Sequence, residues 1–292
     1  YRFLCKHKSV LGSSYTQKGR SGFRGKGSCL LHRKGEMQMQ PLELYIHIPF
    51  CVKKCAYCDF LSGPAGEKEK EEYVKMLVDE IRNCPDTVQN YKVISIFFGG
   101  GTPSLLTGEQ IGRLMDTVRE IFTLDEDAEI TMEMNPGTVT EEKLRKYRQA
   151  GVNRLSIGLQ SVNDEELRLL GRIHTYEEFR EAYHLARANG FSNINVDLIS
   201  AIPGQTVESW RRTLEQVMAL SPEHISAYSL ILEEGTTFYK KYVEDEAKEG
   251  PKLPDEDAER QMYWDTETLM EKNGYHRYEI SNYAKEGYAC RH

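Results

Sequence analysis

Short apolar runs and longer amphipathic stretches alternate along the chain from residue 42 onward. The apolar runs predict strands, and the stretches between them repeat apolar residues every three to four positions, which predicts helices. The predicted strands cover residues 44–48, 93–98, 129–134, 153–159, 192–199 and 224–231. The predicted helices cover about 67–83, 108–122, 140–150, 163–190 and 206–220. Six strand–helix units in series predict an α/β fold with a parallel sheet, either doubly wound or closed toward a barrel.

Polar residues mark where several of these helices begin. Thr140 precedes two glutamates, and Asn163 and Thr175 each stand three positions before a glutamate. Such side chains accept hydrogen bonds from the free N–H groups of a first helical turn. Gly151 and Gly190 follow two of the helices, and we expect them to act as C-terminal caps.

Composition and charge divide the chain into a basic leader and an acidic body. With 39% hydrophobic and 28% charged residues, the chain has the composition of a globular protein. Residues 1–36 hold nine Lys or Arg and one acid, which leaves 29 basic and 44 acidic residues in 37–292. We expect 1–36 to be a disordered leader, tag or upstream read-through, and an acidic body disfavours nucleic-acid binding. No run of 18 apolar residues predicts a membrane span.

Three cysteines, Cys51, Cys55 and Cys58, form a C-x3-C-x2-C pattern directly after the first predicted strand. Three thiolates at this spacing can hold three corners of a cubane iron–sulfur cluster and leave one iron without a protein ligand. A structural zinc site is the alternative, and it would need His47 or Cys84 as a fourth ligand. Disulfides fit the close spacing poorly, so we expect a reducing, cytoplasmic compartment.

Further polar residues end the other predicted strands, at the edge of a parallel sheet where ligands gather. The glycine-rich segment 99–103 follows the second strand and lets a ligand approach the backbone, although it also fits a tight turn. Glu133 alternates with apolar neighbours, a pattern that also fits a solvent-facing position. Asp197 interrupts an apolar strand and needs a partner. Arg172 fits an ordinary surface position at a helix end.

Taken together, these motifs resemble those of the radical S-adenosylmethionine (radical SAM) superfamily. More narrowly, they are similar to the family that holds oxygen-independent coproporphyrinogen III oxidase (HemN) and the haem chaperone HemW. The resemblance covers residues 41–292 and rests on YIHIPFC at 45–51, FGGGTPS at 98–104, GLQS at 158–161, DLI at 197–199 and PGQT at 203–206.

The resemblance implies a partial (β/α)6 barrel over residues 37–232 and a defined cofactor site. Cys51, Cys55 and Cys58 would ligate a [4Fe–4S] cluster, and S-adenosylmethionine (SAM) would chelate the fourth iron. In the superfamily, an electron from the cluster cleaves SAM to methionine and a 5′-deoxyadenosyl radical. The positions that match SAM contacts are Tyr45, Tyr57, Gly100, Gly101, Thr102, Glu133, Gln160, Arg172 and Asp197.

One position separates the two functions within the family. The oxidase pattern has a further cysteine two places after the triplet, where this chain has Phe60. The difference favours a HemW-like chaperone that binds haem and delivers it to apo-proteins. The oxidase, a coproporphyrinogen III dehydrogenase-like oxidoreductase, is the alternative, and a zinc-binding α/β module is the third. Either haem or a porphyrinogen would be bound, with flavodoxin or ferredoxin as reductant.

The C-terminal region, 233–292, is expected to be incomplete. It predicts a helix at about 255–273 and a strand near 274–280, and it stops at His292. In the resembling chains a similar Arg-His pair is followed by an Asn, further helices and a His-Asn-x-x-Tyr-Trp motif tied to haem handling. His276 is a candidate axial haem ligand, although a lone histidine in a strand more often serves structure.

Overall fold

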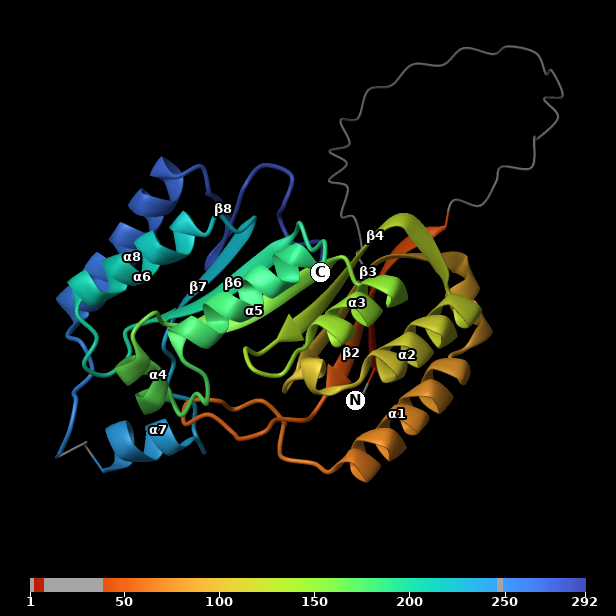
Figure 1. Ribbon diagram of the computed structural model, residues 1–292, viewed down its shortest axis with the longest axis horizontal. Helices are drawn as coiled ribbons and strands as arrows, with labels where there is room; N and C mark the ends of the chain where they lie inside the picture. The colour runs from red at the N-terminus through yellow and green to blue at the C-terminus, as the bar shows by residue number, and fades with distance from the viewer. Residues whose placement is uncertain (1–2, 8–38, 246–248) are drawn as a thin grey trace, which may run out of the picture.

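One nine-stranded sheet organises the molecule (Figure 1). The computed structural model describes residues 3–7, 39–245 and 249–292, with side chains from residue 39 onward. The strands are β1 (Phe3–His7), β2 (Gln40–Ile48), β3 (Tyr91–Gly100), β4 (Thr123–Met134), β5 (Arg154–Gln160), β6 (Ile194–Ser200), β7 (His224–Ser229), β8 (His276–Glu279) and β9 (Asn282–Ala284). They are ordered β1-β2-β3-β4-β5-β6-β7-β9-β8. Neighbours from β2 to β7 pair in parallel, so the six predicted strands form a partial barrel, and the predicted fold class is confirmed.

Helices connect the parallel strands and cover one face of the sheet (Figure 1). They are α1 (Glu67–Arg82), α2 (Gly108–Ile121), α3 (Glu141–Ala150), α4 (Asp164–Leu170), α5 (Tyr176–Ala188), α6 (Val207–Ala219), α7 (Thr237–Tyr239) and α8 (Glu256–Lys272). Shorter helical segments are η1 (Asp86–Asn90), η2 (Pro103–Leu105) and η3 (Lys240–Glu244). The helix α8 packs on α6.

Successive side chains along each strand point to opposite faces of the sheet, one buried against the helices and one concave. In β2, Leu44, Ile46 and Ile48 are fully buried and belong to the core shared with the helices. Tyr45 and His47 point the other way, toward the concave face of the sheet, because successive side chains of a strand alternate. The same period in β4, β5 and β6 leaves polar side chains on the concave face, which therefore can hold a polar ligand.

The predicted helix ends are confirmed in detail. The side chains of Thr140, Asn163 and Thr175 accept hydrogen bonds from first-turn N–H groups of α3, α4 and α5. Gly151 caps α3 in the left-handed conformation, with φ 105°, and Gly190 follows α5 with φ 83°. The stretch 163–190 is two helices, because the chain turns at a left-handed glycine after α4.

Both ends of the chain add strands to the sheet. Most of the predicted leader, 1–36, lies outside the described residues, but Phe3–His7 is a strand that pairs antiparallel with β2. An edge strand offers unpaired backbone groups, so a segment without a core pattern can pair there. The predicted C-terminal helix and strand are α8 and β8, and β9 joins β8 to β7. The expected division at residue 232 stays a prediction.

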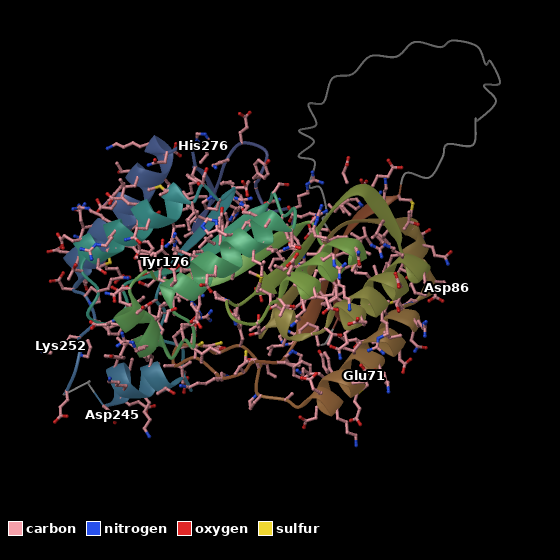
Figure 2. The ribbon with its side chains drawn as sticks, viewed as in Figure 1. Glu71, Asp86, Tyr176, Asp245, Lys252 and His276 are labelled. Atoms are coloured by element: carbon pink, nitrogen blue, oxygen red, sulfur yellow. The ribbon has the colours of Figure 1, made fainter. Side chains whose placement is uncertain are left out.

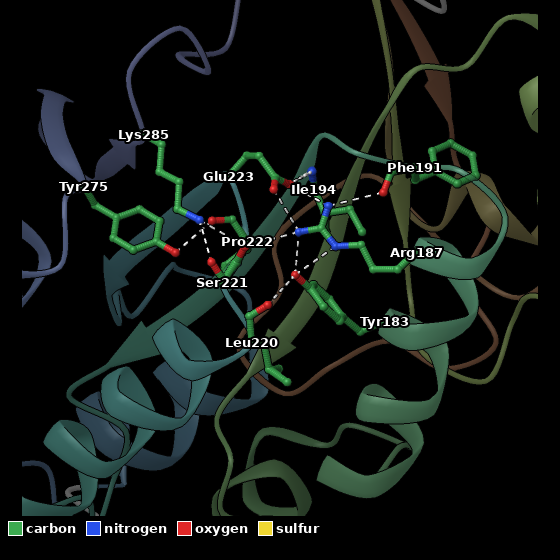
Figure 3. A network of polar contacts seen from close by, with 10 residues as sticks. All are labelled: Tyr183, Arg187, Phe191, Ile194, Leu220, Ser221, Pro222, Glu223, Tyr275 and Lys285. Atoms are coloured by element: carbon green, nitrogen blue, oxygen red, sulfur yellow. Dashed lines mark hydrogen bonds and ion pairs between the residues drawn. The ribbon is translucent and has the colours of Figure 1, made fainter.

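A polar network ties α5 to the amino ends of β6 and β7 (Figure 3). The guanidinium of Arg187 forms an ion pair with Glu223 at 2.8 Å, and the same carboxylate accepts a hydrogen bond from Ile194 N at 3.0 Å. On the other side, Tyr275 donates to Pro222 O at 2.7 Å. This network holds the C-terminal strands against the barrel at the amino ends of the parallel strands. The cysteine loop follows β2 at the opposite end.

Within the described ranges, no helix combines the length and apolar character that crossing a lipid bilayer requires.

Candidate cofactor site

The three cysteines lie on a loop that follows β2 and closes on itself. Cys51 N donates to Gly63 O at 2.9 Å, and Gly63 N donates to Pro49 O at 3.0 Å. Cys51, Cys55 and Cys58 are half-buried and form no disulfide. The loop therefore presents three free thiols from a closed backbone frame.

The middle of this cysteine loop is fastened to the opposite side of the barrel. In Figure 1 the loop runs from the end of β2 toward α4 and α7. Ala56 N donates to Leu170 O at 2.9 Å, and Phe238 N donates to Ala56 O at 2.9 Å. Gly171 has φ 79°, and a Cβ there would lie 3.3 Å from Ala56 N. A side chain at this position would thus be strained and would crowd the loop.

Two of the sulfurs have donors on other elements. Thr102 Oγ1 lies 3.6 Å from Cys51 Sγ, and Arg172 Nη1 lies 3.7 Å from Cys55 Sγ. Burial raises the pKa of the Cys58 thiol. Within residues 39–245 and 249–292, no three His, Cys, Asp or Glu side chains converge closely enough for a single metal ion. A cubane cluster does not require such convergence, because each cysteine binds a different iron.

The glycine-rich segment crosses over β2 at the end of β3. Gly100 has φ 116°, and a Cβ there would lie 2.4 Å from the ring of His47. A Cβ on Gly101 would lie 2.6 Å from Phe50 O, and Gly101 N donates to Ile48 O at 2.8 Å. Glycine is therefore required at both positions by the close approach of β2, in addition to any ligand.

Two carboxylates, on β4 and β6, lie close enough for the charge of one to act on the other. Glu133, from β4, accepts a hydrogen bond from Gly100 N at 2.9 Å, so it does not simply face solvent. Burial, and then the charge of Asp197, raise the pKa of Glu133 to about 8. Burial also raises the pKa of Asp197, on β6. A pair of acids in this environment favours a ligand with hydroxyl groups that donate to them.

One of the two predicted tyrosines lies on β2, and the other lies within the cysteine loop. Tyr45 contacts His47 Nδ1 through its hydroxyl at 3.1 Å, and its ring stacks on Phe97 at 6.2 Å between centroids. Burial raises the pKa of Tyr45 to about 12. Tyr57 is near the guanidinium of Arg172, and burial raises its pKa well above the usual range. Both hydroxyls are therefore neutral donors.

Gln160 and Arg172 meet at the end of β5. Gln160 has φ 77°, an uncommon conformation for a residue with a side chain, and strain of this kind concentrates at functional sites. A Cβ on Gly158 would lie 3.0 Å from the Gln160 amide nitrogen and 3.1 Å from Arg172 Nη2. Arg172 Nη2 donates to Gly158 O at 2.7 Å. Arg172 therefore lies between β5 and the cysteine loop and is not an ordinary surface residue.

A small hollow of about 20 Å³ lies behind the cysteine loop, with room for about one water molecule. Cys55, Thr102, Asn135, Arg172 and His174 are among the residues that line it. It joins the cysteine loop to the ends of β3, β4 and α4. The structure therefore brings three of the predicted residues, Cys55, Thr102 and Arg172, together at this hollow.

Three polar residues that the sequence did not single out support the predicted ones. Asn195 Nδ2 donates to Asp197 Oδ1 at 2.7 Å, and Ser156 Oγ donates to Asp197 Oδ2 at 2.9 Å. Ser156 and Gln160 are an even number of residues apart in β5, as Asn195 and Asp197 are in β6. This alternation is the sequence signal that could have identified Ser156 and Asn195. Asn135 Nδ2 donates to Thr102 Oγ1 at 2.8 Å.

Two further residues that the sequence raised, His276 and Phe60, are placed differently. His276 is an exposed residue of β8, 3.1 Å from a carboxylate oxygen of Glu271. Figure 2 shows it at the upper edge of the molecule, opposite to Asp245 and Lys252 at the lower left. Phe60, at the end of the loop, is 63% exposed.

Comparison with known proteins gives consistent matches. A profile of the radical SAM superfamily matches residues 45–217. The chain is 44% identical over 257 residues to the heme chaperone HemW of Escherichia coli (strain K12), which covers 88% of this chain and 66% of that protein. It is 41% identical to HemW of Haemophilus influenzae, over 87% of this chain and 66% of that one.

A solved structure shares the fold. Coproporphyrinogen III oxidase (HemN) from Escherichia coli aligns with a TM-score of 0.76 at 30% identity, over 87% of this chain and 57% of that one. The chain spans about two thirds of the length of the two HemW proteins.

Proposed function

The chain belongs to the radical SAM superfamily and to the HemW family within it, and from this premise we propose that it is a HemW-like haem chaperone with a [4Fe–4S] cluster and SAM. The observation that carries the proposal is the closed cysteine loop, whose sulfurs are flanked by Thr102 and Arg172.

The residues present fit the cofactors. Cys51, Cys55 and Cys58 would hold three irons, and thiolate is the ligand that such clusters use. Arg172 Nε is buried and makes no hydrogen bond to any described residue, which suits a site for a ligand carboxylate. Gly100 has no side chain that would block a ligand's amino group.

The other predicted residues would bind and orient the nucleoside part. Glu133, Asp197 and Gln160 can accept hydrogen bonds from ribose hydroxyls, and the raised pKa values of both acids reflect a site that excludes much water. Tyr45 and Tyr57 would supply neutral hydroxyls. When bound, the cluster and SAM supply one-electron chemistry at a sulfonium.

Phe60 favours the chaperone over the oxidase, because the oxidase pattern has a cysteine at this position and a phenyl ring cannot replace its thiol. Identity to HemW of Escherichia coli, 44%, also exceeds the 30% identity to HemN. The oxidase, which would make this chain a coproporphyrinogen III dehydrogenase-like enzyme, is the second candidate, and the shared fold with HemN supports it.

The proposed partners are haem, an apo-protein that accepts it, and a one-electron reductant such as flavodoxin or ferredoxin. The five cysteines whose side chains are described are free, which suits a reducing compartment such as the cytoplasm.

The two functions are separated by two assays on the anaerobically reconstituted chain. The chaperone proposal predicts a haem complex with a visible absorption band that saturates on titration, and little or no protoporphyrinogen from coproporphyrinogen with SAM and reductant. Porphyrinogen turnover without a haem complex would favour the oxidase. Absence of a haem complex in the presence of an intact cluster would contradict the chaperone.

A further inference from the structure

We propose that Asn135 is a positioning residue that tunes the cluster by orienting the donors to two of its sulfur ligands. The inference rests on the proposed cluster. Asn135 directly follows β4, and its backbone N donates to Ser104 Oγ at 3.3 Å. Its side-chain amide lines the hollow behind the cysteine loop. The amide makes one hydrogen bond as a donor and one as an acceptor.

The first contact fixes the direction of a hydroxyl proton. Asn135 Nδ2 donates to Thr102 Oγ1 at 2.8 Å. A hydroxyl has one proton, and because its oxygen is engaged as an acceptor here, that proton is directed to Cys51 Sγ, 3.6 Å away. Without the amide, Thr102 Oγ1 could turn its proton to another acceptor. Asn135 therefore keeps the hydroxyl proton of Thr102 directed to Cys51 Sγ.

The second contact fixes a guanidinium. Asn135 Oδ1 accepts a hydrogen bond from Arg172 Nη2 at 2.6 Å, and the same nitrogen donates to Gly158 O at 2.7 Å. With Nη2 held twice, Nη1 is left facing Cys55 Sγ at 3.7 Å. Removing the amide would leave one anchor for Nη2 and let the buried guanidinium plane rotate.

A single amide thus links donors on two ligands of the same cluster. Hydrogen bonds to cluster sulfurs stabilise the added negative charge of the reduced state and raise the reduction potential. Asn135 touches no cysteine sulfur in any described contact, so it acts only through Thr102 and Arg172. Its side chain needs both a donor and an acceptor, which an amide has and a carboxylate lacks.

The test compares Asn135→Ala and Asn135→Asp with wild type in the reconstituted chain. Asn153→Ala is the matched control: Asn153 also makes two side-chain hydrogen bonds, to Ile130 N and Ala128 O at 2.8 Å, but beside the middle of β4. Iron and sulfide content are measured first. The midpoint potential of the cluster is then measured by a redox titration followed by electron paramagnetic resonance.

We expect Asn135→Ala to keep its iron and to lower the equilibrium constant for cluster reduction about tenfold, which is ~59 mV for one electron. Asn135→Asp lowers the potential too, because it no longer donates to Thr102 and adds negative charge. Asn153→Ala keeps the wild-type potential even where it loses stability.

Wild-type potentials in both Asn135 variants would overturn the inference and leave the proposed function standing. If Asn135→Ala loses its iron, Asn135→Asp is measured in its place, and a wild-type potential or loss of iron there as well overturns the inference. A wild-type chain that takes up no cluster would instead refute the proposed function.

Discussion

Glu133→Gln tests the electrostatics of the concave face without any cofactor. In the folded chain Glu133 lies on β4, between β3 and β5 in the sheet, and its hydrogen-bond donor is the N–H of Gly100. Burial, followed by the charge of Asp197, raises its pKa from 4.5 to about 8. Glutamine keeps an acceptor for Gly100 and removes the ionisable group.

The direction of the pH dependence of stability follows from the number of protons bound in the folded and unfolded states. Between pH 4.5 and about 8 the folded chain keeps the Glu133 proton while the unfolded chain has released it, so stability falls as pH rises. At about 1.4 kcal/mol per pH unit, the whole window corresponds to ~5 kcal/mol. Glu133 retains some solvent contact, and we expect about 3 kcal/mol to be realised.

The assay is urea unfolding of the reduced, cofactor-free protein at several pH values from 5 to 8.5. We expect Glu133→Gln to gain about 3 kcal/mol relative to wild type across this range, with most of its advantage present at the highest pH. Glu126→Gln, an exposed position on the same strand, reports what the substitution does by itself. A difference between Glu133→Gln and wild type that does not change with pH would refute the reasoning.

Two further substitutions test the frame of the site. Glu223→Ala removes the partner of Arg187 and the acceptor of Ile194 N, and we expect it to lower the free energy of unfolding by about 3 kcal/mol, measured in urea. A loss below about 0.5 kcal/mol, as at an ordinary surface position, would show that the network is dispensable. Gly100→Ala places a Cβ 2.4 Å from the ring of His47 at φ 116°, so we expect about 2 kcal/mol of destabilisation and reduced iron uptake. Wild-type iron content and stability would contradict this steric argument.

The sequence predicted the six parallel strands because their apolar runs are buried against helices, and it predicted the caps because Thr140, Asn163 and Thr175 act within one helical turn. Local signals of this kind do not depend on the rest of the fold. By contrast, the strand at Phe3–His7 depends on an available sheet edge that no local pattern reveals.

The sequence predicted the site residues that lie at strand ends. The prediction missed residues whose side chains act through another side chain. Glu133 alone fits a surface position as well, until Gly100 N is seen to donate to it. Asn135 belonged to the same strand end as Glu133, but its two contacts join elements 33 and 37 residues away in sequence. Only the folded chain brings such partners together.

The measurement that tests the central claim most directly is electron paramagnetic resonance of the anaerobically reconstituted, reduced chain with and without SAM. We expect about four irons per chain and a cluster signal that changes when SAM is added, because SAM binds the iron that no cysteine holds. Cys55→Ala should lose the cluster. A colourless protein with one zinc, a signal indifferent to SAM, or an intact cluster in Cys55→Ala would contradict the account.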